Sequence, residues 1–185
     1  MLSVVSSPLS VAVKTKEETL LSPDSFVPEG KKKGILMDKA ISKERIARLE
    51  EEFFQGFIKT CGINLVSLEH GRAESRLKIT GAHSQQDDFA HAGVMATMAD
   101  HTAGYAAFSV VTEDYRILTL EFKINFLRPA TGDELVCRAG VVKEGKNILV
   151  ADSEVFSQRD GVEKLVAKAL VTLMAVPAKA LTSRH

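Results

Sequence analysis

The residue whose type and position most suggest chemistry is Asp100, which interrupts the apolar stretch 90–111, AHAGVMATMADHTAGYAAFSVV. This stretch consists mostly of Ala, Gly, Met and Val, and no part of it resembles a solvated face. We therefore expect a helix that is buried on every side. Burying a carboxylate in such a helix is unfavourable unless the carboxylate is paired or serves a reaction. Asp100 is thus the leading candidate for a functional residue.

A polar loop, residues 81–89 (GAHSQQDDF), leads into the predicted helix. The first backbone N–H groups of a helix have no partner within the helix and can bind an oxyanion. The loop and the helix start together are therefore a second candidate site. Ordinary solvated loop residues and helix capping would explain the same residue types.

The nearby histidines do not form an obvious acid–base pair with Asp100. Nine residues at about 100° each place His91 and Asp100 on opposite sides of a regular helix, so we interpret His91 as a residue that shapes the helix entry. His101 points about 100° away from Asp100, and an isolated helix histidine is more often packed or hydrogen-bonded than catalytic. The spacing of His83, His91 and His101 matches no pattern of metal ligands, and we expect no metal site.

The composition is typical of one soluble domain. The chain has 185 residues, 45% of them hydrophobic, and its 24 basic residues balance 24 acidic residues. This balance disfavours nucleic acid or an anionic membrane as a partner. The two cysteines, Cys61 and Cys137, are far apart and form no CxxC pattern, which predicts free thiols in a reducing compartment. Cys137 falls within a predicted strand and is interpreted as a small buried side chain.

Residues 1–35 differ from the rest, because they carry most of the prolines, many serines and a lysine run, without periodicity. We interpret them as a flexible extension, followed by a single domain over residues 36–178 and a short tail over 179–185. The apolar start has no positively charged segment before it and no cleavage site after it, so we expect a cytoplasmic protein without a signal peptide.

Hydrophobic periodicity predicts the elements that position Asp100. An amphipathic helix is expected over residues 37–59, followed by two short strands, 63–68 and 72–79, around a turn at His70-Gly71. After the central helix, strands are expected over 117–128, 133–143, 147–158 and 162–176, separated by turn signals at Gly145 and Asp160-Gly161. Short connections make the sheet antiparallel, so the class is α+β with the sheet wrapped around the helix. Two faces are predicted from strict alternation: Leu118, Leu120, Phe122, Ile124 and Phe126 in one strand, opposite Thr119, Glu121, Lys123 and Asn125, and Leu165, Ala167, Ala169, Val171 and Leu173 in another.

Two of these segments resemble a known family. Residues 85–107, QQDDFAHAGVMATMADHTAGYAA, and the later NFLRPATGDEL are similar to the hot-dog fold thioesterases of the PaaI type. That family has His-Gly/Ala-Gly, a helix with an acidic residue nine positions after the histidine, and a strand closing on Arg/Ser-Pro-Ala-x-x-Gly. The resemblance covers roughly residues 50–176. It implies the hot-dog fold, with about five to six antiparallel strands around one long central helix, and a homodimer joined edge to edge, often paired into a homotetramer.

The resemblance also implies roles for individual residues. Asp100 matches the acidic residue that acts as nucleophile or general base on an acyl-CoA thioester, and loss of hydration would raise its basicity. Gln85 matches the amide position that orients the thioester or the attacking water. The N–H groups of Ala92 and Gly93, which follow His91, would form the oxyanion hole, although many relatives have Gly at the position of Ala92. Thr119 matches a Ser/Thr that helps hold the water in some relatives. Because such sites cross the dimer interface, we expect Asp100 to face Gln85 and Ala92 of the other subunit.

Coenzyme A, which would be part of the substrate and not a separate cofactor, needs cations for its phosphates. Arg128, Lys143, Lys146 and Arg159 are candidates, because they lie at strand ends and turns where a side chain can reach a phosphate without being buried.

Three functions of different kinds follow from these residues. The first is an acyl-CoA thioesterase acting on an aromatic or short- to medium-chain acyl group. The second is a hot-dog hydratase or dehydratase, which would need Asp and His several residues apart on one helix face, whereas Asp100 and His101 are adjacent. The third is a non-catalytic acyl-CoA-binding module, which would tolerate loss of Asp100.

Overall fold

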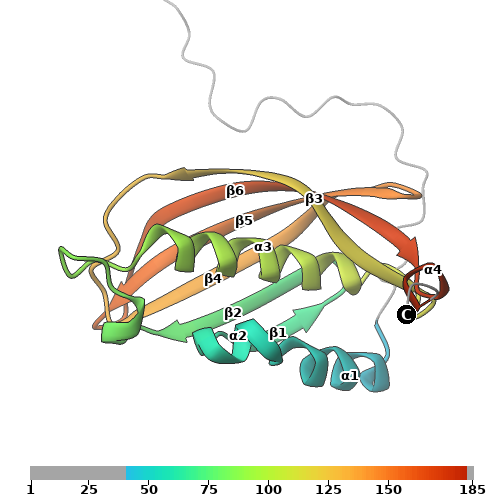
Figure 1. The fold of residues 1–185 in the computed structure, drawn as a ribbon, viewed down its shortest axis with the longest axis horizontal. Helices are drawn as coiled ribbons and strands as arrows, with labels where there is room; N and C mark the ends of the chain where they lie inside the picture. The colour runs from blue at the N-terminus through green and yellow to red at the C-terminus, as the bar shows by residue number, and fades with distance from the viewer. Residues whose placement is uncertain (1–40, 183–185) are drawn as a thin grey trace, which may run out of the picture. The chain divides into compact units, whose positions relative to one another are not determined.

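A six-stranded antiparallel sheet forms the larger layer of the protein in a computed structural model that describes residues 41–182. The predicted extension over residues 1–35 and the last three residues of the predicted tail lie outside this range. The sheet order is β1-β2-β4-β5-β6-β3, so β1 and β3 form its edges (Figure 1). The strands are β1 (Asn64–Glu69), β2 (Arg72–Lys78), β3 (Tyr115–Phe126), β4 (Glu134–Glu144), β5 (Ile148–Arg159) and β6 (Val162–Pro177). This arrangement confirms the predicted α+β hot-dog architecture.

Helix α3 (Ala92–Phe108) lies along one face of the sheet, which curves around it (Figure 1). Its alanines let the helix backbone approach the strands closely, and Met95, Met98 and Tyr105 bury their side chains in the core. The prediction that the helix is buried on every side is wrong, because Ala96, Thr97, Asp100 and Gly104 remain partly exposed. Burial was predicted on every side because small side chains are typical both of close packing and of the floor of a cavity.

The predicted amphipathic helix is two helices, α1 (Lys43–Phe53) and α2 (Gly56–Cys61), and the prediction of one continuous helix over 37–59 is wrong. Ser42 caps α1 by accepting a hydrogen bond from the Arg45 backbone N–H at 3.1 Å. The chain then turns at Phe54 and Gln55 and enters α2 through Gly56, whose φ of 51° favours glycine. Residues 37–40 of the predicted helix lie outside the described range.

A β-bulge in β3 changes which residues face the helix. The register shifts between Thr119 and Glu121, so that Thr119 pairs with Leu173 while Phe122 pairs with Val171. Cross-strand partners point to the same side, and Leu173 and Val171 are buried, so Thr119 and Phe122 both face α3. Leu118 is turned to the outer face with Met174. The predicted alternation therefore fails at Leu120.

A second bulge, at Val166 in β6, corrects the other predicted face. Val155 pairs with Ala167, but its neighbour Phe156 pairs with Leu165. Val155 is fully buried and Phe156 is not, so Leu165 lies on the outer face and does not share the face of Ala167. The remaining members of that face, from Ala167 to Leu173, are directed toward the helix as predicted.

Two short elements complete the chain. A 3-10 helix, η1 (Gly81–His83), begins the loop before α3, and a short helix, α4 (Lys179–Thr182), follows β6 where only a tail was predicted. The turn between β5 and β6 has Asp160 and Gly161 both at positive φ, 51° and 78°, which is the geometry of a two-residue hairpin turn.

Candidate active site

The carboxylate of Asp100 is held by Thr119. The Thr119 hydroxyl donates a hydrogen bond to Asp100 Oδ1 at 2.8 Å, joining the middle of α3 to β3. This contact depends on the bulge at Leu120, because strict alternation would have turned Thr119 to the outer face. A hydrogen bond from a fixed hydroxyl to a carboxylate oxygen fixes the orientation of the carboxylate. The structure thus brings together two of the predicted site residues.

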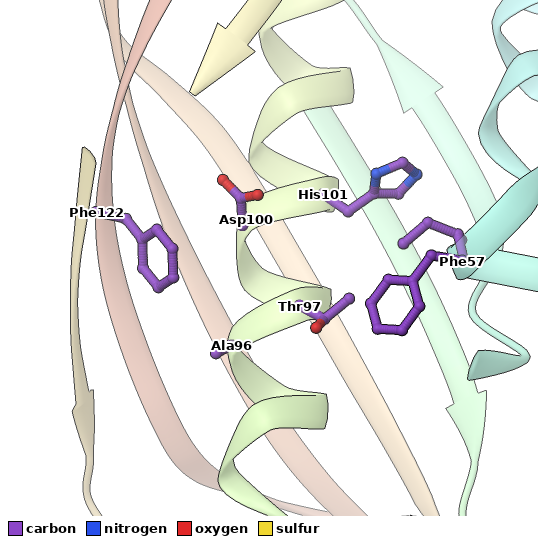
Figure 2. A pocket seen from close by; sticks show the side chains of 7 residues that line it. Phe57, Ala96, Thr97, Asp100, His101 and Phe122 are labelled. Atoms are coloured by element: carbon purple, nitrogen blue, oxygen red, sulfur yellow. The ribbon is translucent and has the colours of Figure 1, made fainter. Parts of the chain in front are cut away.

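Asp100 lies in the lining of a cavity of about 430 Å³ between α3, β3 and α2. In Figure 2 the Phe57 and Phe122 rings stand on opposite sides of α3, with Ala96, Thr97 and Asp100 between them. Asp100 is the only carboxylate in this lining, and most of the other side chains are apolar. The lining residues are Phe57, Ile58, Ala96, Thr97, Asp100, His101 and Phe122. Such a cavity suits an apolar group attached to a polar reacting centre.

A second cavity, of about 360 Å³, contains the other predicted reaction residues. Its lining includes Gln85 from the loop, Ala92 at the start of α3, and Phe126 and Arg128 at the end of β3. Eight residues at about 1.5 Å each separate Ala92 from Asp100 along the helix, a distance of about 12 Å. Within one subunit, therefore, Gln85 and Ala92 are not brought to Asp100.

Backbone bonds fix the loop that carries Gln85. The Gln85 N–H donates to Phe89 O at 2.8 Å, and the His91 N–H donates to His83 O at 2.8 Å. The His83 ring accepts from the Thr80 N–H at Nδ1, 3.0 Å, and its Nε2–H donates to Cys61 O at 2.9 Å. His83 therefore ties the loop to the end of α2 and has a structural role.

His91 caps the central helix and occupies one of the predicted oxyanion donors. Its Nδ1 accepts a hydrogen bond from the Gly93 backbone N–H at 2.9 Å. Among the described residues, the Ala92 N–H donates no hydrogen bond, and Ala92 lies in the lining of the second cavity. The contact between His91 and Gly93 agrees with the interpretation of His91 as a residue that shapes the helix entry, but it leaves the Gly93 N–H already paired and not free to bind an oxyanion.

His101 is engaged away from Asp100. Its Nε2–H donates to Phe53 O at 3.2 Å, and its ring packs against the Phe53 ring at 4.5 Å and the Tyr105 ring at 4.9 Å between centroids. Burial lowers the pKa of His101, because the protonated ring would lose its hydration. The neutral ring therefore positions α1 against α3 and does not form an acid–base pair with Asp100.

The four predicted phosphate-binding cations do not form one group. Arg128 lines the second cavity and donates to Leu165 O at 2.9 Å, and Arg159 pairs with Asp133 at 3.3 Å. Lys143 and Lys146 flank the turn at the opposite end of β5, which spans twelve residues, or roughly 40 Å. Arg128 is thus the candidate that lies beside other predicted site residues.

Both cysteines are free, as expected, and Cys137 is fully buried beneath α3. Burial raises the pKa of the Cys137 thiol to about 12, so it holds its proton at neutral pH. We expect a colourimetric disulfide reagent to modify only Cys61 in the native protein and both thiols after unfolding in guanidinium. Rapid modification of two thiols in the folded protein would contradict this burial.

Within residues 41–182, no group of three or more His, Cys, Asp or Glu side chains could hold a metal ion. In the same range, no helix has both the length and the hydropathy needed to cross a membrane.

Comparison with known proteins agrees with this architecture. The sequence pattern of the thioesterase superfamily matches residues 88–164. The crystal structure of a thioesterase family protein from Silicibacter pomeroyi is 40% identical, with a TM-score of 0.69 over 71% of this chain and 98% of that one. The 1,4-dihydroxy-2-naphthoyl-CoA hydrolase of Listeria monocytogenes is 28% identical over 118 residues, 64% of this chain and 94% of its own.

A PaaI protein is also among the relatives. The acyl-coenzyme A thioesterase PaaI of Escherichia coli is 29% identical over 102 residues, 55% of this chain and 71% of its own length. These similarities agree with the six-stranded sheet and with the long central helix that carries a carboxylate at its middle. The chain belongs to the thioesterase superfamily, with the hot-dog fold of its PaaI-like members.

Proposed function

We propose that this protein is an acyl-CoA thioesterase that hydrolyses an aromatic or short- to medium-chain acyl-CoA to the free acid and CoA. The observation that carries the proposal is the Asp100 carboxylate, oriented by Thr119 at 2.8 Å within an otherwise largely apolar cavity. The Listeria monocytogenes and Escherichia coli relatives are named for hydrolysis of CoA thioesters, which supports the same substrate class. The reaction requires no separate cofactor.

The chemistry of Asp100 has two balanced routes. As a general base it takes a proton from water, whose oxygen attacks the thioester carbonyl, and the C–S bond breaks to release the CoA thiolate, which is then protonated. As a nucleophile its carboxylate oxygen attacks the carbonyl and expels the thiolate, and water then hydrolyses the mixed anhydride. In both routes the negative charge that develops on the carbonyl oxygen needs a donor such as the Ala92 N–H.

We propose that the active unit is a homodimer in which Asp100 of one subunit faces Gln85 and Ala92 of the other. The separation of about 12 Å along α3 leaves each cavity of one chain with only part of the machinery. The edge strand β3 exposes Leu120, Phe122 and Phe126, and its outer edge is unpaired within the sheet. Unpaired apolar edges tend to associate, and a two-fold axis at this edge would join the two sheets edge to edge. A homotetramer made from two such dimers stays a prediction.

The test is thiol release from a panel of acyl-CoAs, from acetyl to hexadecanoyl and including benzoyl and phenylacetyl. We expect turnover of a subset of the panel. Absence of hydrolysis with every member would reject the thioesterase. Hydration assays would then test a hydratase or dehydratase, which the hydrogen bond from His101 to Phe53 disfavours. Binding assays would test a non-catalytic acyl-CoA-binding module.

The hydroxyl of Thr119 gives a smaller, separate prediction. Thr119→Val should lower kcat/KM by about tenfold to a hundredfold, the usual effect of removing a hydrogen bond to a charged group. Thr119→Ser keeps the donor and should retain most of the activity, so the pair separates the hydrogen bond from packing. Equal activity of the Val and Ser variants would show that the contact with Asp100 does not contribute.

A further inference from the structure

The Phe57 ring is unusually exposed for an aromatic side chain. It is 67% exposed, more than any other large hydrophobic side chain in residues 41–182, yet it lies in the lining of the cavity that contains Asp100. Large apolar side chains that remain in contact with solvent beside a cavity are typical of ligand contacts. The reaction proposed above assigns no role to this ring.

The backbone on both sides of Phe57 is anchored. Phe53 is almost fully buried, and its carbonyl accepts the hydrogen bond from His101 at 3.2 Å. Ile58, the next residue after Phe57, is buried in the core. Gly56 supplies the positive φ, 51°, that turns the chain between these anchors. Phe57 is therefore presented from a fixed segment and not from a loose loop.

The cavity runs across a floor of small side chains. Ala96 and Thr97 on α3 form this floor, and Figure 2 shows the Phe122 ring on one side of the helix and the Phe57 ring on the other. Asp100 lies between the two rings, so an acyl chain whose carbonyl is next to Asp100 can extend only until it meets one of them. A bulky wall at a fixed distance from the reacting atom limits chain length by steric exclusion.

We propose that Phe57 is a specificity-determining residue that closes the acyl cavity and sets the longest acyl chain the protein accepts. This inference rests on the proposed thioesterase function. Its consequence is that the chain-length profile depends on the size of residue 57 while the chemistry at Asp100 does not.

The experiment compares kcat and KM for saturated acyl-CoAs from two to sixteen carbons in the wild type and two variants. Phe57→Ala should raise kcat/KM at least about tenfold for acyl chains just longer than the longest that the wild type accepts. This is the usual effect of one or more methylenes in a hydrophobic pocket. Phe57→Trp should shift the limit in the opposite direction. Both changes should appear mainly in KM.

The matched control is Phe54→Ala, which removes the same side chain from the same bend. Phe54 is 38% exposed but is not in the lining of the cavity, so its removal should leave the profile unchanged. An unaltered profile in both Phe57 variants, or an equal shift in the Phe54 variant, would overturn the inference while the wild type still hydrolyses acyl-CoA. Failure of the wild type on the whole series would instead remove the proposed function.

Discussion

Replacing Asp100 with asparagine should lower kcat/KM for the best acyl-CoA substrate by about a thousandfold, within the range expected for loss of a general base. Asparagine has nearly the shape of aspartate, and its carbonyl oxygen can still accept the hydrogen bond that Thr119 donates at 2.8 Å. It can neither accept a proton from water at neutral pH nor attack a thioester. The fold should therefore persist while the reaction stops, and the loss should appear in kcat.

The measurement is steady-state thiol release, accompanied by circular dichroism and size-exclusion chromatography of the variant. Asp152→Asn is the matched control, because Asp152 lies on β5 in register with Leu170 on the outer face of the sheet, away from α3. The control should retain wild-type activity. If Asp100→Asn kept more than about a tenth of the activity, its carboxylate could not be the base or the nucleophile.

Two inactive variants should restore activity when their subunits are mixed. Asp100→Asn and Gln85→Ala should each be nearly inactive as homodimers, since removing one group that acts on the transition state costs about 10²–10³ in kcat. In a mixed dimer, one composite site combines the intact Asp100 of one subunit with the intact Gln85 of the other. Random exchange gives half mixed dimers with one intact site each, so about a quarter of the wild-type activity should return.

This result is expected only if each active site combines the Asp100 cavity of one subunit with the Gln85 cavity of the other. If Asp100 and Gln85 acted within a single chain, every site in the mixture would keep one substitution and no activity would return. A chain carrying both substitutions, mixed with an equal amount of the Asp100→Asn chain, is the control that should stay inactive in either case. Subunit exchange can be verified with a tag on one of the two variants.

The strands and the central helix could be predicted from the sequence because their signals are local. Glycine at a turn such as Gly161, and a run as small and apolar as 92–108, identify these elements without knowledge of their neighbours. The bulge at Leu120 could not be predicted, because Leu118, Leu120 and Phe122 continue a regular pattern and only the pairing with β6 reveals the shift. The break at Gly56 was missed for the same reason, since the apolar spacing from Phe53 to Phe57 fits one helix.

The candidate site was predictable only in part. Asp100 could be identified as a candidate because a carboxylate in an apolar helix is unusual. The family resemblance indicated Thr119, which is nineteen residues away along the chain. The capping of Gly93 by His91 and the placement of Phe57 at the cavity depend on side-chain directions that no periodicity encodes. The separation of Gln85 from Asp100 likewise arises from the length of α3 and not from any single residue type.

The bulge at Leu120 also affects how the chain can tolerate changes in its length. The extra residue shifts the phase of β3 by half a period, so that the two halves of the strand follow opposite in-and-out patterns. Loss of Leu120 alone would leave a strand without a bulge, in which Leu118 still faces outward and Thr119 still faces the helix, because Glu121 would follow Thr119 directly. Regular pairing of every residue in the strand would instead place Leu120 opposite Leu173, where Thr119 now lies, and Asp100 would face a leucine. The contact between Thr119 and Asp100 thus depends on how β3 pairs with β6 and not on the number of residues in the strand.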